Sequence, residues 1–69
     1  MANLRADLIK ASRIHFEAHV EKHRINVENL LQNSQGVAEH PDILGSMDAM
    51  ISAIAESREK LDVIEELMP

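Results

Sequence analysis

Apolar side chains recur along the chain in two series, each with the spacing of one face of a helix. The first series advances in steps of three, four and seven residues, and the second alternates steps of four and three without a break. The pattern predicts an all-α chain, with one helix near residues 3–34 and another near residues 41–67. The first series comprises Ile9, Phe16, Val20, His23, Val27 and Leu30, and the second comprises Ile43, Met47, Met50, Ile54, Ser57, Leu61, Ile64 and Met68.

The segment between the two predicted helices, residues 35–40, is long enough to reverse the chain and too short for another element. Gly36 suits the left-handed residue that commonly ends a helix, and Pro41 suits the first position of the next one, where an N–H would have no helical partner. Asn3 is expected to cap the first helix. We therefore predict one domain over residues 1–69, an antiparallel helical hairpin.

Charge is divided unequally between the two halves. Residues 1–34 hold five Lys/Arg and four Asp/Glu, whereas residues 35–69 hold two and eight. The antiparallel register that best pairs opposite charges places Val20 beside Ile54 and Val27 beside Met47. Exposed ion pairs contribute only about 0.2–1 kcal/mol each, so these would specify the register more than hold the fold. The predicted pairs between helices are Lys10 with Glu65, Arg13 with Asp62, and Glu17 with Arg58.

A second set of apolar positions lies off the two main series. A hairpin of two helices leaves such positions uncovered, because each helix covers only one side of the other. Two hairpins that bury each other's open faces form a four-helix bundle, so we predict a homodimer. The alternative to the homodimer is a monomeric hairpin whose second apolar face is partly exposed to solvent. The predicted interface comprises Leu4, Leu8, Ala11, Ala18, Ile25, Leu44, Ile51 and Ala55.

His15, His19 and His23 recur every fourth residue on the first predicted helix. Two histidines at this spacing can share a zinc ion, with a ligand from a facing helix completing the shell. The three spread over about 12 Å of helix rise, so one ion does not reach all of them easily. We interpret His23 as a seam residue and the other two as surface residues, and we keep a metal-binding helical bundle as the alternative function.

The composition narrows the function further. The chain has no cysteine, a net charge of −5 and Phe16 as its one aromatic residue outside the histidines, which argues against thiol chemistry and against nonspecific nucleic-acid binding. No apolar run approaches the roughly 18 residues of a membrane span, and no signal-peptide pattern is present. We find no catalytic constellation and no cofactor motif. The expectation is a cytoplasmic, non-enzymatic structural or protein-interaction module.

Two stretches carry a resemblance to a known group of proteins. The run Glu21–Glu28, followed by Gly36–Ile43 and an acidic second helix, resembles small proteins of contractile-tailed cyanophages and other marine phages. The similarity covers roughly residues 16–67, and those proteins have no assigned activity. The resemblance therefore implies a marine viral origin and a host-cell cytoplasmic setting, but no mechanism. A phage or host protein is then a candidate partner for the outer faces of the bundle.

Overall fold

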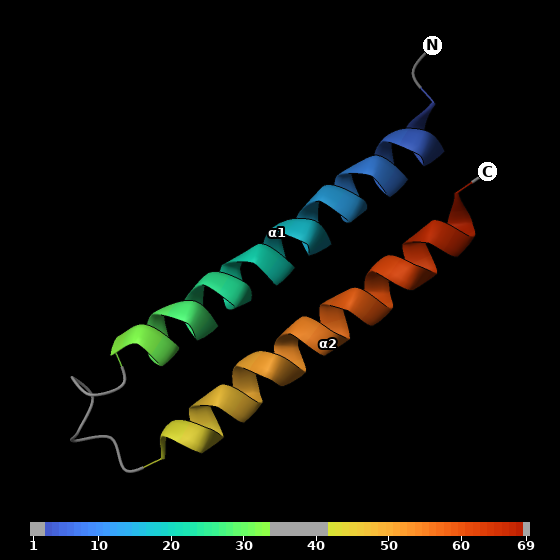
Figure 1. Cartoon of the computed structure of the whole chain (residues 1–69). Helices are drawn as coiled ribbons and strands as arrows, with labels where there is room; N and C mark the ends of the chain where they lie inside the picture. Colours follow the sequence, from blue (N-terminus) through green and yellow to red (C-terminus); the bar gives the residue numbers. More distant parts are fainter. Residues whose placement is uncertain (1–2, 34–41, 69) are drawn as a thin grey trace.

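The computed structural model describes residues 3–33 and 42–68 as two antiparallel helices (Figure 1). Helix α1 spans Leu4–Asn33 and helix α2 spans Ile43–Leu67, and they pack against each other along their length. The beginning of α1 and the end of α2 lie at the same end of the molecule. No strand occurs within the two described ranges. The predicted all-α hairpin is thus confirmed, as an elongated body of 55 × 18 × 13 Å.

The first helix begins where the sequence predicted. The Asn3 side-chain oxygen accepts a hydrogen bond from the Ala6 N–H at 3.2 Å, and the Asn3 carbonyl accepts one from the Asp7 N–H at 3.0 Å. An amide side chain at this position satisfies a backbone donor that has no partner inside the helix. The expected cap at Asn3 is therefore confirmed.

The second helix begins two residues later than predicted, at Ile43. The Asp42 carboxylate accepts a hydrogen bond from the Gly45 N–H at 2.7 Å, and the Asp42 carbonyl accepts one from the Ser46 N–H at 3.2 Å. Asp42 is therefore the cap, and the first helical position lies after it. The predicted roles of Gly36 and Pro41 fall outside the described residues.

Gly45 lies so close to its cap that a side chain there would collide with it. A Cβ on Gly45 would lie 2.6 Å from the Asp42 Cγ atom. We predict that Gly45→Ala changes stability little, because a helix-propensity gain of about 1 kcal/mol is offset by displacement of a cap that contributes about 0.5–2 kcal/mol. In the Asp42→Ala background the same substitution should stabilise by about 1 kcal/mol. Urea unfolding of the unsubstituted chain, the two single variants and the double variant measures the cycle, and equal effects of Gly45→Ala in both backgrounds would contradict the clash.

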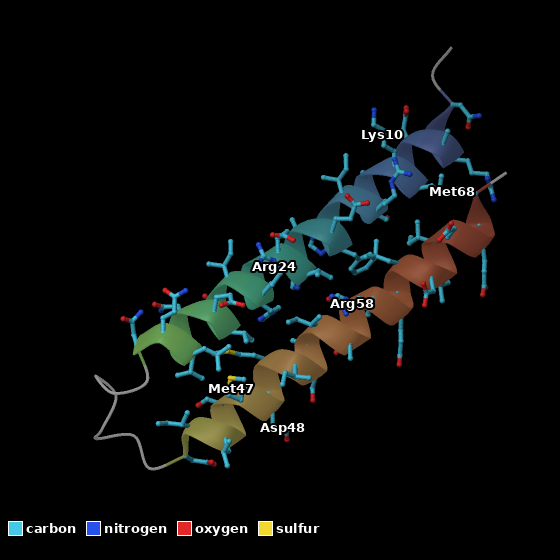
Figure 2. The ribbon with its side chains drawn as sticks, in the orientation of Figure 1. Lys10, Arg24, Met47, Asp48, Arg58 and Met68 are labelled. Carbon is cyan, nitrogen blue, oxygen red and sulfur yellow. The ribbon has the colours of Figure 1, made fainter. Side chains whose placement is uncertain are left out.

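The two apolar series meet between the helices and form the seam. Every member is half-buried except Ser57, which is buried at 5% exposure, and Met68, which is 38% exposed. Figure 2 shows Met47 directed toward α1 while the adjacent Asp48 points away from it. Among the described residues no apolar side chain is fully buried. The seam is thus confirmed as the contact between the helices, but two helices alone do not enclose it.

The three predicted ion pairs between the helices are not formed. Each ion pair in the described part of the chain lies within one helix, where a partner three or four residues away needs no alignment of one helix against the other. Between the helices, the Arg5 guanidinium instead donates to the Leu67 carbonyl at 2.8 Å, and Arg13 donates to the Met68 sulfur at 3.8 Å. The placing of Val20 beside Ile54 and of Val27 beside Met47 stays a prediction. The pairs present are Arg13–Glu17 at 3.7 Å, Arg24–Glu21 at 3.0 Å and Lys60–Glu56 at 3.2 Å.

Candidate functional site

All eight residues of the predicted interface are exposed in the hairpin. The large members keep half or more of their surface in contact with solvent, and the three alanines are exposed as well. Side chains of this size are commonly buried in a folded protein. Their exposure makes them available to a partner. The exposed fractions are 69% for Leu4, 58% for Leu8, 58% for Ile25, 81% for Leu44 and 53% for Ile51.

These residues do not form one continuous face. Leu4 and Leu8 line a groove at the free ends of the helices together with Leu67 of α2. Leu44 and Ile51 precede Leu67 by 23 and 16 residues, which places them nearly half a turn away around α2. Leu4 and Leu8 of α1 therefore lie on a different side of the hairpin from Leu44 and Ile51 of α2.

We call the first of these sides the Val63 side and define it by Leu4 and Leu8 of α1 with Lys60, Val63 and Leu67 of α2. The three α2 residues follow steps of three and four and so share one row. Sequence reasoning missed Val63 and Leu67, which are 53% and 48% exposed. Their spacing was visible in the sequence, but which α2 row lies alongside Leu8 depends on how the two helices are placed.

The opposite side, which we call the Ile51 side, carries a row on α2 that changes from apolar to charged residues. Leu44, Ile51, Arg58 and Glu65 succeed one another at intervals of seven residues. Toward the free ends this side is hollowed between Arg13, Glu17, Leu61, Ile64, Glu65 and Met68. The Ile51 side is therefore apolar near the turn and charged toward the free ends.

The histidine row is a set of neighbouring rings along α1. The ring centroids of His15 and His19 lie 5.0 Å apart, and those of His19 and His23 lie 5.8 Å apart. His15 also meets the Phe16 ring edge-on at 5.2 Å. His19 was expected at the surface, but it is half-buried like His23, whereas His15 is exposed. Four residues make slightly more than one helical turn, so each histidine lies nearer the seam than the one before it, from His15 to His23.

Two lysines and two other histidines lie near His19. Partial burial lowers its pKa from the ordinary value of 6.5, and the nearby His15, Lys22, His23 and Lys60 lower it further. Lys60 belongs to α2, and its ammonium group lies 5.4 Å from the centroid of the Phe16 ring of α1. The arrangement favours a neutral imidazole at position 19.

The predicted metal ligands do not come together as one site. Across residues 3–33 and 42–68, no three His, Asp or Glu side chains are grouped so that they would hold a metal ion. The cations beside His19 also oppose the binding of a further positive charge there. The row is described more simply as neighbouring rings at the edge of the seam, with their planes tilted by 52° and 54° to one another.

Neither described helix is long and apolar enough to cross a membrane. No family model, curated protein or solved structure matches this chain. The function must therefore be inferred from the surface of the hairpin itself.

Proposed function

We propose that this chain is a non-enzymatic protein-interaction module that self-associates into a homodimeric four-helix bundle. The observation that carries the proposal is the half-covered seam. Its apolar side chains meet between the helices, yet among the described residues none is fully buried. Apolar surface left in water is the main source of favourable free energy for association.

The exposed area supports the proposal quantitatively. The hairpin exposes 5585 Å², whereas a compact monomer of 7.7 kDa exposes about 4,300 Å². The difference is about 1,300 Å² per chain, and a standard interface buries about 800 Å² per partner. The radius of gyration is likewise 16.2 Å, against about 11 Å for a compact domain of this length. Packing against a second hairpin would bury the exposed area that a single extended hairpin leaves in excess of a compact monomer.

A second copy of the chain is also the simplest partner. It presents the same half-covered seam and is present at the same concentration, and two-fold dimers are the commonest oligomers. A phage or host protein, which the resemblance to marine phage proteins suggests, is the competing occupant of the same surface. The phage origin and the host-cell cytoplasmic setting stay proposals that rest on that resemblance.

Sedimentation equilibrium at micromolar concentration tests this function. We predict a mass near 15.4 kDa, twice the chain mass of 7.7 kDa. Because unfolding is then coupled to dissociation, a hundredfold rise in concentration favours the folded dimer by about 2.7 kcal/mol and should raise the melting temperature by several degrees. A mass of one chain, with a melting temperature that does not depend on concentration, would refute the homodimer.

A further inference from the structure

We propose that the second copy packs on the Val63 side of the hairpin, with α1 of each copy against α2 of the other. This inference rests on the proposed self-association, and it adds which face is buried and how the two copies are oriented. Three observations carry it: the shape of the two sides, the state of their charged groups and the charge of the two helices.

The Val63 side has grooves and ridges of the kind that pack against another helix. One groove at the free ends is lined by Leu4, Leu8, Ile9 and Leu67, with Arg5 at its edge. A second groove follows the same α2 row and is lined by Phe16, Val63 and Ile64, with Glu56, Glu59 and Lys60 around it. Apolar ridges of a neighbouring helix pack into grooves of this kind. Leu8 and Val63 supply the matching ridges, since each exposes more than half of its surface.

The two cationic groups beside the grooves of the Val63 side, those of Lys60 and Arg5, already have partners. The Lys60 ammonium lies 3.2 Å from the Glu56 carboxylate and rests near the Phe16 ring. The Arg5 guanidinium donates to the Leu67 carbonyl. A charged group that keeps its partner is far less costly to bring into an interface than one that loses water without compensation.

The Ile51 side is less suited to burial. Its α2 row continues from Ile51 to Arg58 and Glu65, and within the described ranges neither of these two charged residues forms an ion pair. Closing a partner over them would remove water from two isolated charges. On this α2 row the apolar residues are Leu44 and Ile51, at the end of α2 away from Met68.

Charge selects the orientation. Residues 3–33, which contain α1, hold five Lys/Arg and four Asp/Glu, a net charge of +1, whereas residues 42–68, which contain α2 and its cap, hold two and seven, a net charge of −5. A two-fold axis across the hairpin would place α2 beside α2 and bring the two acidic helices together. An axis along the hairpin places α1 on α2 of the other copy, which reduces this repulsion. Neighbouring helices are then antiparallel, and the free ends of both copies lie together.

Matched aspartate substitutions test the face. Leu8→Asp and Val63→Asp are expected to weaken association at least tenfold, because each places a carboxylate in the buried contact. Ile51→Asp introduces the same charge at a residue of similar exposure, 53% against 58% for Leu8, and should change association less than threefold. Circular dichroism shows whether each variant keeps its helices, and sedimentation measures the association. A dimer that is weakened by Ile51→Asp and not by the other two would overturn the proposed face.

A distance between labels tests the orientation. The chain has no cysteine, so Glu66→Cys introduces a single site for a spin label at the exposed free end of α2. Free ends together predict a separation of about 20–35 Å between the two labels, two to three helix diameters. Free ends apart predict a value near the 55 Å length of the hairpin, and that result would overturn the orientation.

The two levels of the proposal fail in different ways. A chain that sediments as a monomer removes the homodimer, and the Val63 face as its interface, before any variant is made. A stable dimer with the wrong substitution pattern or the long label distance leaves self-association standing and removes only the inferred face or orientation.

Discussion

Replacing Ile54 by aspartate is expected to abolish the cooperative unfolding of the hairpin. Ile54 is a half-buried member of the seam, and a carboxylate there removes apolar contact and places an uncompensated charge between the helices. The expected loss is about 2–4 kcal/mol. A chain below about 70 residues rarely draws more than 3–5 kcal/mol from its core, so this loss removes most of the stability. Circular dichroism at 222 nm during heating measures the effect.

Ile51→Asp is the matched control for this substitution. The two isoleucines lie three residues apart on α2, and the introduced charge is the same, but Ile51 is 53% exposed and lies off the seam. A surface substitution of this kind changes the free energy of unfolding by about 0.5 kcal/mol or less. Equal destabilisation by the two variants would show that the seam is not the contact that holds the hairpin.

Acidification from pH 8 to pH 5 is expected to destabilise the hairpin through His19. Because its pKa is lowered in the folded state, the unfolded chain takes up the proton first as the pH falls. The contribution of His19 is therefore fully present above its unfolded pKa of about 6.5 and is lost as the pH falls from there through the lowered folded value. Unfolding in urea at several pH values and fixed protein concentration measures the slope.

A second titration occupies a separate pH window. The hydrogen bond and charge of Arg24 lower the pKa of Glu21 from its ordinary value of 4.5, so this contribution is lost only below that pH. Between pH 5 and pH 8 the slope thus reports on histidine.

His19→Gln should flatten the slope in this interval. The NMR titration midpoint of the His19 ring in the intact chain should lie below 6.5. A midpoint at or above 6.5, or a slope that His19→Gln leaves unchanged, would contradict the effect of the surrounding cations. Repeating the titration with one equivalent of zinc tests the metal alternative, which requires the metal to raise stability where the histidines are neutral.

The sequence alone was sufficient to predict the helices and their contact face. A period near 3.6 is a local property of the chain, and the residues at that period, such as Val20 and Ile54, are those that the helices shield from water. The Asn3 cap was equally predictable, because it depends on one side chain and a backbone donor three residues later. The start of α2 could not be predicted to the residue, because Asp42 and Pro41 both suit the beginning of a helix. The hydrogen bond from the Gly45 N–H to the Asp42 carboxylate shows that Asp42 is the cap.

The tertiary structure decided how the outer residues are grouped. Periodicity assigns each residue to a row of its own helix but does not say which row of α2 lies beside which row of α1. In the structure Leu8 shares a groove with Leu67, and Ile51 lies on the other side of the hairpin. The same reason accounts for the ion pairs that were not formed, since Arg13 meets Glu17 within its own helix. It also accounts for His19, whose environment depends on Lys60 from the other helix. The sequence by itself determined the hairpin and its seam, because spacing along one helix is local, whereas the surface it offers to a partner depends on the relative rotation of two helices.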